Sequence, residues 1–406
     1  MDTFNLIKEI PLYKDLYGEQ LINFNLNDKL DQYPILERNH IVDGFPNNWM
    51  TNNLKTAIDK DSIETTTTSG TSGNRIQIIR KKSWWIEEYK RTYKHSPSLK
   101  NFNVGRSKKA ILTTAICSNA SCYLDFPSYE DRIISNTLYL NLSKDPNNWT
   151  KTDIERMLLE LNKFKPEYLD ADPIYLGLFL KMLEEYNILT TLHTPKFISL
   201  SYEMVPRFTR RFIESRMNCA IGNFYGTTEL GYIYLEHNEK IIRCPELSKV
   251  EFLPLSQERG LYYLIISSIK NEYMPFLRFR VGDIVKINSN TNWKNFNDDT
   301  QIEFFCGREK DIVFNERGTP VTPGEIDYSL GKLENNLLIY QIEVRNKNDI
   351  LFRYLTINNA VLSEENKDQI TSKLFDFFGS QLKIQFKLER SISPESSGKF
   401  SLLKQV

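Results

Sequence analysis

The sequence predicts an α/β protein with a large, multi-layered α/β N-terminal domain and a small α+β C-terminal domain. Short β-rich runs alternate with amphipathic helical segments over the first three quarters of the chain, as expected for a sheet covered by helices. A polar stretch without periodicity, residues 288–300 (NSNTNWKNFNDDT), then interrupts this alternation. A second, shorter set of strands and one helix follows it.

The predicted elements follow from the spacing of apolar residues. Apolar residues recur every three or four positions in three segments, as in Ile154, Met157, Leu158 and Leu161, and predict helices over residues 84–94, 153–163 and 174–186. Runs rich in β-formers predict strands over residues 61–68, 110–116, 138–142, 197–200 and 261–267. In the C-terminal part, strands are predicted over 337–344, 351–357 and 382–388, and a helix over 364–378. The charged turn GREKD places the domain boundary between residues 310 and 311, giving domains 1–310 and 311–406.

Composition excludes several classes of function. The 406 residues contain 52 Lys and Arg and 52 Asp and Glu, so no global basic field is present to hold a nucleic acid or an anionic membrane. No apolar run approaches the roughly 20 residues of a membrane-spanning helix, and the N-terminus lacks the pattern of a secretory signal. We therefore expect a cytoplasmic protein without nucleic-acid or membrane partners; a homodimer is compatible with the sequence.

Cysteine and histidine patterns give no metal or disulfide signature. The five cysteines are odd in number and form no C-x-x-C pair, and the four histidines are scattered, so we expect reduced thiols and no zinc site. Cys306 is a conceivable acyl-accepting nucleophile, although a lone cysteine is more often a packing residue. Asp170, Asp172, Glu184 and Glu185 are interpreted as a helix cap and a solvated helix face.

A loop rich in glycine and hydroxyl groups is the first candidate site. Residues 65–73 read TTTTSGTSG, in which the glycines allow backbone N–H groups to turn toward an anion and the hydroxyls supply further donors. This chemistry suits phosphate. The loop is no Walker A motif, because no Gly-Lys-Ser/Thr ends it and the next segment reads as a strand. A solvated hairpin loop is the alternative.

Four further motifs follow in order. In NFYGTTELG, residues 223–231, a tyrosine beside a glycine offers a stacking face and Glu229 a hard oxygen ligand for magnesium. In FRVGD, Asp283 follows a glycine turn and can accept hydrogen bonds from ribose hydroxyls. GREKD (307–311) and SGK (397–399) complete the series. Each motif alone is equally compatible with an ordinary turn or a solvated charge.

Taken together, the five motifs resemble, in the same order, those of the adenylate-forming superfamily, which includes acyl-CoA synthetases, peptide-synthetase adenylation domains and luciferases. Four further segments, YPILERNHI, PEYLDADPIYLGLFL, ISLSYEMVP and MPFLRFRVGD, are most similar to the phenylacetate-CoA ligase-like branch. The similarity extends from Tyr33 to Lys399.

The resemblance implies roles for individual residues. Residues implied in ATP and AMP binding are Ser69, Gly70, Thr71, Ser72, Gly73, Tyr225, Gly226, Thr227, Asp283 and Arg308. Lys399, Thr228 and Glu229 are the implied catalytic residues, with Glu229 also the Mg²⁺ ligand. Asp311 is the implied hinge between domains, about which the resemblance implies a mobile C-terminal domain that carries Lys399. The carboxylate pocket is expected at Cys117, Asn119, Tyr123, Phe126, Asn223 and Phe224.

The resemblance also implies the reaction: ATP- and Mg²⁺-dependent conversion of a small-molecule carboxylic acid, with aryl or other flat acids favoured, to an acyl-adenylate and pyrophosphate. Transfer of the acyl group to coenzyme A is the first expectation for the second step. Two alternatives stay open: a stand-alone adenylation enzyme that loads an acyl carrier protein or forms an amide, and a non-catalytic nucleotide-binding protein of the same fold.

Overall fold

The structure, a computed structural model, describes residues 6–26, 28, 30–68, 75–115, 128–288, 290 and 292–406. The chain forms two compact units, each built from two separated segments. The first unit contains residues 1–100 and 225–304, and the second contains residues 101–224 and 305–406. The chain therefore passes between the units near residues 100, 224 and 304. The domain boundary predicted at residues 310 and 311 stays a prediction.

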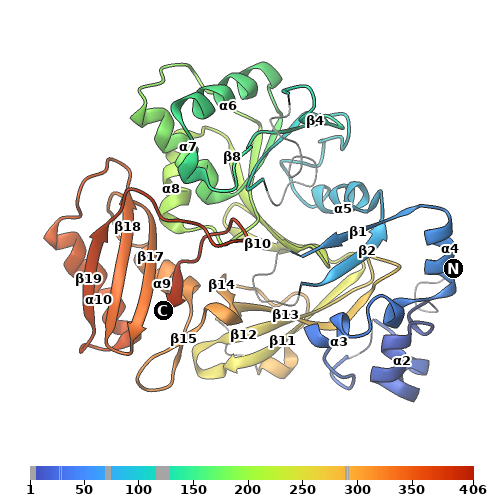
Figure 1. The fold of residues 1–406 in the computed structure, drawn as a ribbon. Coiled ribbons are helices and arrows are strands. Elements are labelled where there is room, and N and C mark those ends of the chain that lie inside the picture. The colour runs from blue at the N-terminus through green and yellow to red at the C-terminus, as the bar shows by residue number, and fades with distance from the viewer. Residues whose placement is uncertain are drawn as a thin grey trace. The chain divides into compact units, whose positions relative to one another are not determined.

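A mainly parallel sheet forms the centre of the second unit (Figure 1). Six of the eight strands of this sheet begin in the second unit and follow one another in the order β8-β7-β6-β3-β5-β4, and neighbours among these six are parallel except β4 and β5. The strands are β3 (Lys109–Leu112), β4 (Ile133–Ile134), β5 (Thr137–Tyr139), β6 (Tyr168–Ala171), β7 (Phe197–Leu200) and β8 (Ala220–Thr227), the last of which ends in the first unit. Every residue of β3, β6 and β7 is buried, as expected for strands covered on both faces.

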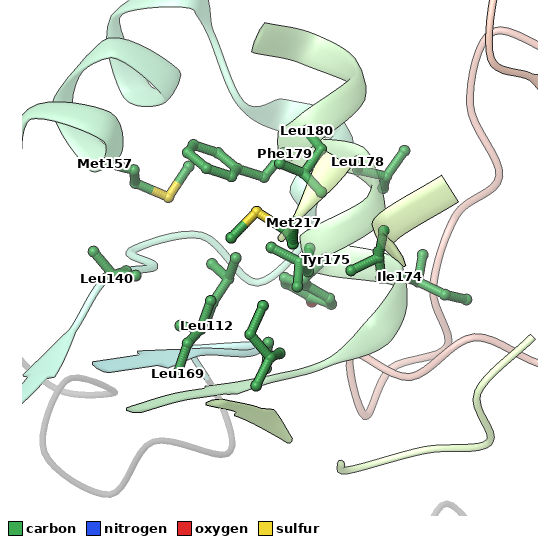
Figure 2. Close-up of a cluster of buried hydrophobic side chains, with 14 of the residues drawn as sticks. Leu112, Leu140, Met157, Leu169, Ile174, Tyr175, Leu178, Phe179, Leu180 and Met217 are labelled. Atoms are coloured by element: carbon green, nitrogen blue, oxygen red, sulfur yellow. The ribbon is translucent and has the colours of Figure 1, made fainter. Parts of the chain in front are cut away.

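Helices α6 (Lys151–Phe164), α7 (Pro173–Glu185) and α8 (Arg207–Arg216) pack beside this sheet. Thr150 and Asp153 form a capping box that starts α6, and Asp172 caps α7 just before Pro173. The apolar faces of the helices meet the strands in one cluster, in which Met157, Tyr175 and Met217 lie around Leu112 and Leu169 (Figure 2).

A second sheet of this unit holds the C-terminal segment, in the order β19-β18-β17-β20. The elements from residue 304 to the last residue are β14 (Phe304–Arg308), η6 (Glu309–Asp311), β15 (Val313–Phe314), β16 (Pro320–Val321), α9 (Pro323–Leu330), β17 (Leu337–Asn346), β18 (Asp349–Thr356), α10 (Glu364–Phe378), β19 (Lys383–Leu388) and β20 (Leu403–Gln405). Strands β15 and β16 pair with each other in a separate two-stranded sheet. Leu338, Ile339 and Leu355 belong to the cluster of Figure 2, and the Thr209 hydroxyl donates to the Leu338 carbonyl at 2.6 Å. The C-terminal sheet thus packs against α7 and α8.

The first unit consists of antiparallel strands and short helices. The elements are α2 (Pro11–Tyr17), α3 (Arg38–Val42), α4 (Asn52–Asp59), β1 (Ile63–Thr67), β2 (Gln77–Lys81), α5 (Trp84–Tyr93), β9 (Gly231–His237), β10 (Lys240–Arg243), β11 (Ser248–Ser256), β12 (Leu261–Ser268) and β13 (Phe276–Lys286). Strands β11, β12 and β13 form a meander, and β1 pairs with β2 and β9 with β10. Its core includes Trp49, whose ring lies 5.8 Å from Tyr13 and 5.7 Å from Phe276 between centroids.

The predicted mixed α/β fold is confirmed, and several predicted elements are found with small shifts in their ends. Strand β7 and helix α10 have the predicted bounds, whereas β3 ends at Leu112 and β5 at Tyr139, earlier than predicted. Among the described residues, no helix combines the length and apolar character that crossing a bilayer requires.

Candidate active site

In the first unit, the motif NFYGTTELG forms the end of β8, a tight turn and the start of β9. The Thr227 hydroxyl accepts a hydrogen bond from the Leu230 N–H at 3.2 Å, which closes the turn. Gly226 is required because a Cβ there would lie 2.5 Å from the Gly231 carbonyl oxygen, and Gly231 itself has a φ of +72°. The turn therefore has little freedom and presents Thr228 and Glu229 in a fixed conformation.

Tyr225 and Asp283, two residues of the implied nucleotide site, lie together in the first unit. The Tyr225 hydroxyl donates to Asp283 Oδ2 at 2.7 Å, joining the end of β8 to β13. Gly282, with a φ of +83°, makes the turn in backbone direction just before Asp283. The hydrogen bond fixes the tyrosine ring beside this carboxylate.

Glu229 supplies a carboxylate that suits a divalent cation. The residue is 7% exposed, and its carboxylate oxygens are not among the fully buried polar atoms that lack a partner. A carboxylate oxygen that keeps contact with solvent is a hard ligand of the kind that Mg²⁺ prefers. No group of three or more potential metal ligands occurs among the described residues.

A buried ion pair between Glu88 and Lys270 contacts the backbone at the start of β9, directly after the turn that carries Thr228 and Glu229. Glu88 on α5 is fully buried, and its Oε1 accepts from Lys270 Nζ at 2.7 Å and from the Tyr232 N–H at 2.8 Å. Burial lowers the pKa of Lys270, and the Glu88 carboxylate opposes that change. A Cβ on Gly231 would lie 2.4 Å from Glu88 Oε1. The ion pair thus fixes where β9 begins.

In the second unit, Lys399 lies in a tight turn held against the parallel sheet and its helices. The Gly398 N–H donates to the Glu395 carbonyl and the Glu395 N–H to the Lys399 carbonyl, both at 2.8 Å. Glu203 Oε2 anchors the turn by accepting from the Phe400 N–H at 2.6 Å. The Tyr175 hydroxyl also contacts it, sharing its hydrogen between the carbonyls of Lys144 at 2.9 Å and Gly398 at 3.2 Å. The backbones of Gly398 and Phe400, the two residues adjacent to Lys399, are therefore both held by hydrogen bonds to side chains.

Two carboxyl groups lie near this turn. Burial, which is the largest effect, raises the pKa of Asp172 to about 7 and raises that of Glu203 well above its usual range. Each carboxyl lies close enough to affect the pKa of the other, and the positive charge of Lys399 lowers both. The interpretation of Asp172 as a helix cap is confirmed, but its position beside Lys399 was not foreseen.

The neighbouring Asp170 corrects a sequence-based expectation. It is not on a solvated face: it is buried on β6, forms an ion pair with Lys109 at 2.9 Å, and accepts hydrogen bonds from Ser199 and Tyr202. A carboxylate in the middle of a parallel strand is tolerated because each oxygen has a donor or a cation. Glu184 and Glu185, at the end of α7, are exposed as expected.

The remaining predicted site residues are placed as follows. Phe224 is 3% exposed, with its ring 5.9 Å from that of Phe197, and Asn223 is half-buried on β8. Arg308 directly precedes η6, which contains Asp311, and Lys310 forms an ion pair with Glu395 at 3.2 Å. Lying outside the described residues are Ser69, Gly70, Thr71, Ser72, Gly73, Cys117, Asn119, Tyr123 and Phe126. Their roles, and those of Arg308 and Asp311, stay predictions.

Sequence reasoning missed Glu88, Lys270 and Glu203. A weak signal exists for the first two: Glu88 falls on the same helix face as Trp84 and Thr92, and Lys270 comes two residues after the end of β12. Glu203 lies within the segment ISLSYEMVP, which was singled out for its similarity to a family, but no role was assigned to this residue. Charged residues within apolar segments are therefore worth examining as buried pairs.

Over most or nearly all of its length, the chain shares its fold with solved structures of acid–CoA ligases and of an amide bond synthetase. A structure of 2-hydroxyisobutyryl-CoA ligase in the postadenylation state, in complex with R3-HIB-AMP, has a TM-score of 0.68 at 12% identity and covers 99% of this chain and 86% of that one. The anthranilate CoA ligase AuaEII in complex with anthranoyl-AMP has a TM-score of 0.58 at 12% identity, covering 83% and 65%. The amide bond synthetase McbA from Marinactinospora thermotolerans has a TM-score of 0.54 at 12% identity, covering 84% and 67%.

At the level of sequence, the chain is similar to Protein CapK of Staphylococcus aureus, with 25% identity over 252 residues, or 61% of this chain. The match spans about half of that relative, 54% of its length. No family model matches the sequence.

Proposed function

We propose that this protein activates a carboxylic acid with ATP and Mg²⁺, forming an acyl-adenylate and releasing pyrophosphate. The observation that carries the proposal is the hydrogen bond between Tyr225 and Asp283, which joins two of the implied nucleotide-binding residues on a fold shared with enzymes crystallised with acyl-AMP. Tyr225 would lie against adenine and Asp283 would bind ribose, with Arg308 as a second ribose contact.

The chemistry asked of this chain is mainly electrostatic. A carboxylate oxygen attacks the α-phosphorus, the bond to the β-phosphate oxygen breaks, and negative charge has to be neutralised on both reactants. Lys399 would bridge the acid and the α-phosphate, Thr228 would contact the α-phosphate, and residues 69–73 would hold the β- and γ-phosphates. Magnesium bound to ATP supplies charge neutralisation next to the Glu229 carboxylate.

For the second step we propose coenzyme A as the acyl acceptor, after a rotation about Asp311 that removes Lys399. Two ligases of coenzyme A among the similar folds support this choice, and an amide bond synthetase among them supports the amine alternative. We also propose an aryl or other flat acid as substrate, a location in the cytoplasm and a place in the phenylacetate-CoA ligase-like branch.

Acid-dependent exchange of labelled pyrophosphate into ATP tests the proposal. The acids are aryl, alkyl and amino acids, and coenzyme A, an acyl carrier protein and simple amines are then added to those that react. Lys399→Ala should lower the exchange at least about 10²-fold, the range expected for a charge-stabilising group. Lys383→Ala, an exposed lysine of β19, serves as the control. Binding of ATP without exchange for any acid would favour a non-catalytic protein, and unchanged exchange in Lys399→Ala would refute the role of Lys399.

A further inference from the structure

The turn that carries Lys399 is held from both sides by groups that lead to Asp172 and Glu203. On one side, Asp172 Oδ1 accepts from the Tyr175 N–H at 3.2 Å, and the Tyr175 hydroxyl shares its hydrogen between the carbonyls of Lys144 at 2.9 Å and Gly398 at 3.2 Å. On the other side, Glu203 Oε2 accepts from the N–H of Phe400 at 2.6 Å. The residues immediately before and after the lysine are therefore each connected to one of the two carboxyl groups.

Each carboxyl group also has one oxygen that these contacts leave unused. Asp172 Oδ2 and Glu203 Oε1 are buried, and neither accepts a hydrogen bond within the described part of the chain. A buried carboxylate oxygen without a donor is costly, so a compensating proton or cation is expected near both. A proton shared between the two carboxyls would satisfy both oxygens and leave one negative charge on the pair.

Lys399 is the cation whose charge acts on both members of this pair. Burial raises the pKa of both carboxyls and the charge of Asp172 raises that of Glu203 further, whereas the charge of Lys399 lowers both. The nearby Asp170 and Lys109 are bound to one another at 2.9 Å, so they form a separate, balanced pair. A singly protonated pair and the Lys399 ammonium together carry no net charge, which is the favourable state in a buried site.

We propose that Asp172 and Glu203 are positioning residues for Lys399, holding its turn by the backbone and its ammonium by a shared negative charge. This inference rests on the proposed function, because its consequence is a correctly placed lysine in the adenylation step. The arrangement also fits a lysine that has to leave this position after adenylation, as in the proposed rotation about Asp311. When Lys399 departs, the pair can take up a second proton instead of remaining charged and buried.

The backbone contacts and the shared charge can be tested separately. Glu203→Ala removes the acceptor of the Phe400 N–H, whereas Glu203→Gln keeps an oxygen there and removes the charge. Asp172→Asn likewise keeps a helix-capping oxygen. The control is Glu184→Gln, which alters an exposed glutamate at the end of α7 that pairs with Arg216. Hydrogen exchange of a peptide covering residues 393–402 and steady-state pyrophosphate exchange are measured for each variant.

We expect Glu203→Ala to speed hydrogen exchange of this peptide at least about tenfold, and Glu203→Gln to leave it near that of the unmodified protein. The double variant Asp172→Asn, Glu203→Gln should lower kcat for pyrophosphate exchange at least about tenfold with little change in KM for ATP, a split that a general loss of structure would not give.

Unchanged hydrogen exchange in Glu203→Ala would overturn the backbone role. Unchanged kcat in the double variant, with Lys399→Ala inactive, would overturn the charge role and leave the proposed function intact. If the unmodified protein activates no acid, the proposed function fails and the positioning of Lys399 for adenylation fails with it, while the hydrogen-exchange result still decides whether Glu203 anchors the turn.

Discussion

Each unit contains a buried carboxylate site behind a residue of the proposed active site, and the two sites differ in how their charge is balanced. In the first unit, Glu88 accepts from the Lys270 ammonium, the Tyr232 N–H and Arg91 Nε at 3.2 Å. In the second unit, Asp172 and Glu203 each have an oxygen without a donor among the described residues. The first site is complete in the folded chain, and the second depends on Lys399 or a proton.

This difference suggests different tasks. Removing either member of a complete buried ion pair leaves an uncompensated charge, so such a pair favours a single rigid arrangement, here the start of β9. A carboxyl pair with one shared proton can take up a second proton when a nearby cation leaves, so losing that cation costs less free energy than it would in a complete ion pair. Such a pair suits a turn that moves. We therefore expect the first site to respond to mutation mainly in stability and the second mainly in pH dependence and catalysis.

The largest expected effect is the loss of stability in Glu88→Ala. This change leaves the Lys270 ammonium buried and unpaired, which costs about 3–5 kcal/mol for a buried pair. Urea unfolding of the purified variant measures it. The double variant Glu88→Gln, Lys270→Met, which buries no charge, should recover a large part of the loss. A loss below about 1 kcal/mol in Glu88→Ala would contradict the rigid-support interpretation.

The stability of the Asp172→Asn variant, relative to that of the unmodified protein, should increase as the pH rises. The pKa of Asp172 is raised in the folded protein to about 7 from an ordinary 3.8, so its contribution to stability is fully present below pH 3.8 and is lost as the pH rises through about 7. A pKa change of about 3 units corresponds to a loss of at most about 4 kcal/mol in the free energy of unfolding of the unmodified protein. The variant does not show this loss, because asparagine does not ionise. Unfolding of both proteins between pH 4.5 and 8.5 measures the difference. A difference independent of pH would show that Asp172 is ionised in the folded protein throughout.

Gly398→Ala should displace the lysine turn. Gly398 has a φ of +80°, and a Cβ there would lie 2.4 Å from Thr114 Oγ1. The backbone strain costs about 1–2 kcal/mol, and the clash should lower pyrophosphate exchange about tenfold or more. Gly105→Ala is the matched control, since its φ is +85° and nothing lies within 4 Å of an added Cβ. Equal activity of the two variants would mean that the contact with Thr114 does not hold the turn.

The smallest expected effect is that of Tyr225→Phe. The change removes one hydrogen bond to Asp283 and keeps the ring, so it costs about 1 kcal/mol, or about a fivefold rise in KM for ATP with kcat nearly unchanged. Steady-state pyrophosphate exchange at varied ATP measures it. A large fall in kcat would mean that the hydroxyl takes part in the chemical step.

Helices and strands were predicted correctly where the pattern that defines them lies within the segment itself. Helix α10 and strand β7 were predicted with their observed ends, because their apolar spacing and boundaries lie within the segment itself. Strand β3 was predicted to end four residues too late, since β-propensity continues past Leu112 whereas its ladder of paired residues ends there. Helix α8 was missed: its many arginines conceal the apolar positions Phe208, Phe212 and Ile213.

By itself, the sequence determined the mixed α/β fold and the order of the nucleotide motifs, because apolar periodicity, glycine turns and hydroxyl groups are local properties. Only the tertiary structure decided that Tyr225 meets Asp283, that Glu88 meets Lys270, and that Asp172 and Glu203 lie beside Lys399. These groups lie between 31 and 227 positions apart, so their separation in the chain gives no hint of contact. Burial removes the water that would otherwise screen a charge, and burial is created only when distant segments pack together.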